Sequence, residues 1–171
     1  MKIFIGGVSA LATACVFGVA AAVAFIYSGF YNVTAATPHT RLVGWALHQV
    51  YQNSMERDSA SIEAPADLGI AANVQSGAQL YNQNCAMCHS APGTSLSPIG
   101  RGIYPSAPIL LEITRKNHPN QMFWVIKNGI KMTGMADFGK SLTNQQIWDI
   151  AAFLQKDRGI TASGYAKLVS K

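Results

Sequence analysis

Two cysteines and a histidine lie close together in the second half of the chain, in the run Cys85-Ala86-Met87-Cys88-His89. The thiols are one helical turn apart and can bond to the two vinyl groups of one haem, and the adjacent histidine can face its iron. A zinc site would need a second Cys or His pair, and a thioredoxin-like redox pair would need a βαβ context. A disulfide between cysteines three positions apart is uncommon. The motif therefore predicts one covalently attached haem c, held by Cys85 and Cys88 with His89 as a ligand.

Helical patterns flank this motif on both sides. Upstream, Asn73 is a candidate N-cap for a helix that reaches the motif. Downstream, Pro119–Asn128 fits a short helix that ends at Gly129. Thr143 then begins a capping box, T-x-x-Q, before an amphipathic helix that stops at Gly159. These are the elements that must position the motif.

Residues 73 to about 158 resemble a class I cytochrome c domain. Four motifs occur in that family's order: GAQLYNQNCAMCHSAPG, GRGIYPSAPIL, NGIKMTGMADFG and LTNQQIWDIAAFLQ. The resemblance implies an all-α fold around haem, in which Gly77 and Tyr81 cross Ile150 and Phe153. It also implies electron transfer rather than enzymatic catalysis, and haem attachment outside the cytoplasm.

The same family uses a methionine sulfur as its second axial ligand. Gly134-Met135-Ala136-Asp137-Phe138 aligns with the family pattern Gly-Met-Pro-x-Phe, so the resemblance implies Met135 as that ligand. Met132 is the rival in the same loop, while Met122 falls inside the short helix and is expected in the core. His118 would instead give a bis-histidine site, but it opens a helix and is expected to face solvent.

Two positions near the expected haem depend on prolines. In the family, a proline before a leucine supplies the carbonyl that accepts a hydrogen bond from the ligating histidine, and Pro108 fits this better than Pro105. These prolines could also simply shape the loop. Ala136 replaces the family's usual proline, so we expect a more flexible ligand loop. This departure supports an alternative function, a haem sensor or weak peroxidase whose labile methionine leaves the iron.

The N-terminal segment carries no charged side chain from Ile3 to Tyr27. A helix of that length is about 37 Å long, enough to cross a hydrocarbon core of roughly 30 Å. We therefore predict a transmembrane helix rather than a cleaved signal peptide, whose apolar core is normally about 7–15 residues. Cys15 is expected to be a small apolar residue in it rather than a lipid attachment point. A row of small residues favours packing against another helix: Gly6, Ala10, Ala14, Gly18 and Ala22.

Between anchor and haem domain, Thr37-Pro38 predicts the start of a helix that extends to about Arg57. Trp45 and Tyr51 would suit the membrane interface. The predicted organisation is a transmembrane anchor over 1–31, a juxtamembrane helix and linker over 32–72, a cytochrome c domain over 73–158 and a C-terminal tail over 159–171.

Composition and charge agree with this division. Of the 171 residues, 49% are hydrophobic and only 12% charged, which excludes a charged disordered protein. Residues 74–171 carry ten basic and four acidic side chains, so this part has a formal charge of +6. A basic rim could steer an acidic redox partner, or the charges could be a solvated surface. No motif for nucleic acid accompanies them.

The sequence thus predicts a membrane-anchored mono-haem cytochrome c that passes single electrons between redox protein partners of a respiratory chain or a dehydrogenase. It would be a free shuttle or, through its anchor helix, a subunit of an integral membrane complex. The expected location is a bacterial inner membrane, crossed once, with the haem domain on the periplasmic side.

Overall fold

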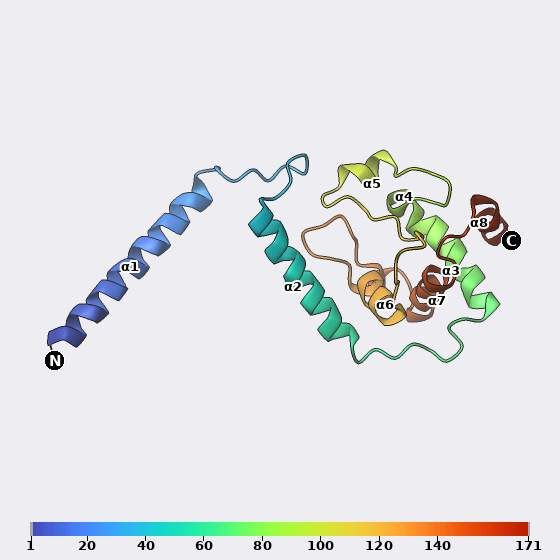
Figure 1. Cartoon of the computed structure of the whole chain (residues 1–171), viewed down its shortest axis with the longest axis horizontal. Coiled ribbons are helices and arrows are strands. Elements are labelled where there is room, and N and C mark those ends of the chain that lie inside the picture. The colour runs from blue at the N-terminus through green and yellow to red at the C-terminus, as the bar shows by residue number, and fades with distance from the viewer. Residues whose placement is uncertain (1, 171) are drawn as a thin grey trace. The chain divides into compact units, whose positions relative to one another are not determined.

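The computed structural model describes residues 2–170, with side chains from Ala10 onward, so Met1 and Lys171 lie outside the described residues. The described chain is helical (Figure 1), and its elements are α1 (Lys2–Tyr27), α2 (Arg41–Ser59), α3 (Ala71–Asn84), α4 (Ala86–His89), α5 (Pro98–Gly102), α6 (Pro119–Asn128), the 3-10 helix η1 (Phe138–Lys140), α7 (Asn144–Lys156) and α8 (Ala162–Val169). It divides into two compact units, one up to Thr37 and one from Pro38 onward. The all-α prediction is confirmed.

The first unit contains α1. Its segment Ala10–Tyr27 has a mean hydropathy of 2.2 and buries none of its residues within the protein. Length and composition therefore allow this helix to cross a membrane, and a signal sequence has the same properties. In the predicted row of small residues, Gly6 lies before the first described side chain, and the row's other members are exposed.

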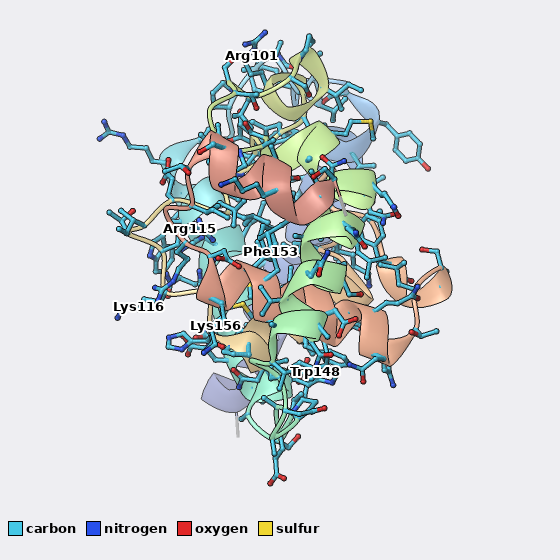
Figure 2. The ribbon with its side chains drawn as sticks, turned by 90° about the vertical axis from the view of Figure 1, so that its right-hand side faces the viewer. Arg101, Arg115, Lys116, Trp148, Phe153 and Lys156 are labelled. Carbon is cyan, nitrogen blue, oxygen red and sulfur yellow. The ribbon has the colours of Figure 1, made fainter. Side chains whose placement is uncertain are left out.

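The core of the second unit forms where α3 crosses α7. A Cβ atom on Gly77 would lie only 1.9 Å from the backbone oxygen of Asp149, so the two backbones meet closely there. Tyr81 packs against Phe153 with ring centroids 5.5 Å apart, and both side chains are fully buried. Figure 2 shows Phe153 between the two helices. The crossing that the resemblance implied, which also includes the buried Ile150, is confirmed.

The predicted helix boundaries are confirmed at α6 and at the start of α7. Both hydrogen bonds of the capping box form, from Gln146 N to Thr143 Oγ1 (3.3 Å) and from Thr143 N to Gln146 Oε1 (2.8 Å). The predicted start of α3 at Asn73 is wrong: α3 begins at Ala71, and the Asn73 amide donates to the backbone oxygen of Asp67. A turn before the helix takes up this side chain, so it does not cap.

Helix α2 begins after Thr40, not after Thr37, and packs against α6 of the same unit. Its residue Trp45 is exposed, as an interfacial position requires. Tyr51 is half-buried within the protein instead, because it lies on the face of α2 that meets the domain.

Helix α8 lies in the segment that the sequence analysis leaves as a tail. The Thr161 hydroxyl caps its first turn, and Tyr165 is buried against Tyr81 and Phe153. The Tyr165 hydroxyl also donates to Asn82 Oδ1 over 3.0 Å. This helix therefore adds a layer to the core outside α3.

Candidate cofactor-binding site

All four predicted site residues line one cavity of the second unit: Cys85, Cys88, His89 and Met135. The cysteines and the histidine come from the end of α3 and from α4, and Met135 comes from the loop between α6 and η1. Much of the remaining wall is apolar, and α6 and α7 contribute five residues to it: Met122, Val125, Ile126, Ile150 and Leu154. The fold thus brings two thiols, an imidazole and a thioether to one apolar space.

The two cysteines are free thiols at the turn that joins α3 to α4. Burial raises the pKa of the Cys85 thiol to about 12, and the nearby Cys88 adds to this shift. Cys85 is therefore protonated at neutral pH, unlike the attacking thiol of a redox-active pair, whose pKa is lowered. This electrostatic environment argues against the thioredoxin-like use of the motif.

The His89 ring is fixed by a hydrogen bond from its Nδ1 to the backbone oxygen of Pro108, over 2.8 Å. A carbonyl oxygen only accepts, so Nδ1 carries the proton and Nε2 keeps its lone pair. Burial lowers the pKa of His89 and Arg115 lowers it further, while the Pro108 hydrogen bond opposes both. The predicted contact with Pro108 is confirmed, and it orients the ring so that Nε2 is the nitrogen available to a ligand.

Met135 is held by backbone contacts of its loop. Its carbonyl accepts from Ile130 N (3.2 Å), and its amide donates to Thr133 Oγ1 (3.0 Å). Gly129 has a φ of +65°, and a Cβ there would lie 2.7 Å from the Met135 oxygen and from the Ala136 carbonyl carbon. These contacts restrain the loop in which Ala136 replaces a proline.

The rival ligands separate by position. Met132 is 76% exposed and is absent from the residues that line the cavity. Met122, which the sequence placed simply in the core, lines the cavity from α6. His118 is exposed and precedes α6, as predicted. The cavity is therefore lined by three thioethers, Met87 from α4, Met122 from α6 and Met135, of which only Met135 comes from a loop.

The sequence analysis did not assign several polar side chains that also line the cavity, and the largest of them are Tyr51 and Arg115. Tyr51 comes from α2, and Arg115 comes from the segment before α6. No spacing rule links Tyr51 to the cysteine motif, which follows it by more than thirty residues. Only the packing of α2 on the domain brings it there.

The potential ligands in this cavity suit an iron whose other coordination sites are already filled by a porphyrin. Within residues 2–170, no group of three or more His, Cys, Asp and Glu side chains could hold a bare metal ion. Haem iron needs only two axial ligands from the protein, and this cavity has an imidazole and a thioether. The two thiols and the apolar wall match the vinyl groups and the faces of a porphyrin, so the residues fit haem c.

The basic side chains are spread over the outside of the domain. Figure 2 shows Arg101 at one end of the domain, well apart from Lys116 and Lys156, and all three are exposed. Lys140 forms an ion pair with Asp137 over 3.2 Å. Exposed basic side chains such as these can attract an acidic partner.

Residues 72–154 match the model of a protein family described as "Cytochrome C oxidase, cbb3-type, subunit III". No curated protein and no solved structure matches the chain. The matched segment runs from the first turn of α3 into α7 and contains all four predicted site residues. Helices α1, α2 and α8 lie outside it.

Proposed function

Residues 72–154 form a cytochrome c domain of the cbb3-type subunit III family, and on this premise we propose that the protein carries single electrons through one haem c. A cytochrome c domain implies covalent haem and electron transfer. The observation that supports the specific site is the single apolar cavity lined by Cys85, Cys88, His89 and Met135. We propose that it acts as a carrier and not as an enzyme.

Bound haem supplies a one-electron change between ferric and ferrous iron. The Cys85 and Cys88 thiols would hold it, each S–H adding across one vinyl group. The Nε2 atom of His89 and the sulfur of Met135 would coordinate its iron, and a thioether ligand favours a high reduction potential. With both of these ligands bound, the iron would have no site open to a substrate.

The ligand assignment is tested by comparing Met135→Ala with Met122→Ala and Met132→Ala in the full-length protein. We expect Met135→Ala to retain covalent haem, to lose the charge-transfer band of methionine-ligated ferric haem, and to lower the midpoint potential. The exposed Met132 is the matched control and should change neither property. Loss of the band in Met122→Ala, with the band intact in Met135→Ala, would give the ligand role to Met122.

The hydrogen bonds that restrain the Met135 loop support a permanently six-coordinate iron over the sensor or peroxidase alternative. Carbon monoxide separates the two, because it binds only where an axial position opens. We expect no binding to the reduced wild-type protein at neutral pH. Rapid, stoichiometric binding would favour the alternative.

We propose that α1 is retained and anchors the protein in a bacterial inner membrane, with the haem domain on the periplasmic side. Its uncharged length and the exposure of its side chains support this. The test is intact mass together with fractionation. A full-length chain that stays in the membrane after alkaline washing is expected, whereas a soluble chain lacking α1 would mean that α1 is a signal sequence.

We further propose that the anchor joins the protein to a larger respiratory or dehydrogenase complex. The described members of the small-residue row on α1, Ala10 to Ala22, support close helix packing in the membrane. Mild detergent extraction should recover the haem protein together with an integral membrane partner. Recovery as a monomer alone would favour a free electron shuttle.

A further inference from the structure

Helix α2 precedes the family-matched segment, yet it is attached to the haem domain at both ends. Just before it, the backbone amide of His39 donates to the hydroxyl of Tyr104 over 3.1 Å. At its last residue, the backbone oxygen of Ser59 accepts from Asn120 Nδ2 over 3.0 Å. Met55 and Ser59 are buried. These contacts fix α2 against the domain (Figure 1).

Between these two attachments, Tyr51 lines the cavity. Its hydroxyl donates to the sulfur of Met55 over 3.3 Å, and a thioether is a weak acceptor for a half-buried phenol. Burial raises the pKa of Tyr51, whereas the positive charge of Arg115 opposes this shift. The phenol is thus a protonated donor that lies close enough to Arg115 to feel its charge.

Arg115 is the cation at this part of the cavity wall. Its Nε donates to Asn117 Oδ1 over 3.3 Å, and the Asn117 amide in turn donates to the backbone oxygens of Leu110 and Leu154, each over 2.8 Å. Because Asn117 is buried, its hydrogen bond fixes the position of the Arg115 guanidinium. Among the described side chains, no carboxylate forms an ion pair with Arg115.

The cavity therefore has a phenol donor and a guanidinium but no anion. Its described titratable lining consists of Cys85, Cys88, His89, Tyr51 and Arg115, and includes no Asp, Glu or Lys. The first three are taken up by haem attachment and ligation in the proposed function. An anionic ligand would stabilise a half-buried cation that has no carboxylate partner. Haem brings such a group, because it carries two propionate side chains.

We propose that Tyr51 is a haem-contacting residue whose hydroxyl donates a hydrogen bond to a propionate beside Arg115, which makes α2 a wall of the haem site. This inference rests on the proposed function, since it needs haem in the cavity. It assigns a cofactor contact to a helix outside the family-matched segment. The phenol exchanges a weak sulfur acceptor for a charged oxygen.

The test is Tyr51→Phe, which keeps the ring in place and removes only the hydroxyl. Loss of a donor to an ionised carboxylate makes that carboxylate easier to protonate. We expect the propionate's acid dissociation constant to fall about tenfold, the size of a charge-assisted hydrogen bond. The inflection in the plot of midpoint potential against pH should move to higher pH by about one unit. Covalent haem content should not change.

Tyr104→Phe is the matched control, because its hydroxyl also bonds to the segment that leads into α2 but is not among the groups that line the cavity. Its inflection should stay at the wild-type pH. The inference is overturned if Tyr51→Phe leaves the inflection in place, or if both variants move it equally through looser packing of α2.

Redox-induced infrared difference spectra give a second measurement. The propionate carboxylate bands should differ between the wild type and Tyr51→Phe, and identical bands would also overturn the inference. Absence of covalent haem from the wild-type protein is a separate result, because it would remove the proposed function itself.

Discussion

The closest backbone approach in the haem domain, at Gly77, gives the sharpest stability prediction. In Gly77→Ala the new Cβ would lie 1.9 Å from the Asp149 oxygen, 2.5 Å from the Asp149 carbonyl carbon and 3.0 Å from the Phe153 Cβ. Ordinary contact begins at 3.4 Å, so α3 and α7 must separate by about 1.5 Å. The obstacle is helix backbone, which cannot rotate away as a side chain can.

The energetic cost follows from two opposing effects. Overpacking a core costs about 1–3 kcal/mol of stability. A clash with backbone atoms is expected to cost an amount at or above the upper end of that range. Alanine gains about 1 kcal/mol over glycine within a helix. The separation would also strain the 2.7 Å hydrogen bond from the Ser76 hydroxyl to Asp149. We expect a net loss of about 2–4 kcal/mol, or a fall in Tm of very roughly 6–15 °C for a unit of this size.

Urea unfolding of the haem-loaded protein, followed by far-ultraviolet circular dichroism, measures this loss. Gly102→Ala is the matched control, because no atom lies within 4 Å of its new Cβ, and its stability should stay within about 0.5 kcal/mol of wild type. If Gly77→Ala also stays within 0.5 kcal/mol, the close crossing of α3 and α7 does not limit stability, and the reasoning fails.

Three further changes test other parts of the fold. Gly129→Ala forces a side chain into the left-handed region and against the Met135 backbone, so we expect a loss of about 2 kcal/mol and weakened methionine ligation in the ferric spectrum; an unchanged spectrum would show that the loop adapts. Thr143→Ala removes the cap of α7 and should lower the urea-derived stability by about 1 kcal/mol, and an unchanged midpoint would contradict this role. Burial raises the pKa of Asp157, whose Oδ2 has no hydrogen-bond partner. The folded state therefore holds the Asp157 proton more tightly than the unfolded state does. The stability that this protonation provides is present at low pH and is lost as pH rises through the raised pKa. Asp157→Asn should therefore gain a few tenths of a kcal/mol at neutral pH, after allowance for solvent screening, and should lose that part of the pH dependence; an unchanged pH profile of unfolding would refute this.

Features that depend on a few neighbouring residues could be predicted from the sequence. The capping box at Thr143 joins two residues three positions apart, and its hydrogen bonds form as expected. The cysteine motif is similarly local, and the structure places its three reactive side chains on one cavity wall. The contact between His89 and Pro108 spans nineteen residues, and it could be predicted only through the family resemblance.

Features that depend on tertiary packing could not be predicted in this way. The start of α3 depends on a turn that captures the Asn73 amide, so a good capping residue does not cap. Helix α8 is short, and its only buried residue, Tyr165, finds its partners on α3 and α7. Tyr51 lies near the cysteine motif only because α2 packs on α6. In each case the deciding contact is remote in sequence.

The added helices have a physical reason in the small size of the matched segment. A domain of about 85 residues buries little apolar surface, so its stability is low. Part of its interior is also taken up by the cavity proposed to bind haem. α2 adds the buried Met55 on one side, and α8 adds the buried Tyr165 on another. Ile150 and Leu154 of α7 belong to both the core and the cavity wall. Haem in the cavity would therefore pack directly against the central helix of the core, so attachment of the cofactor and stability of the fold should rise together.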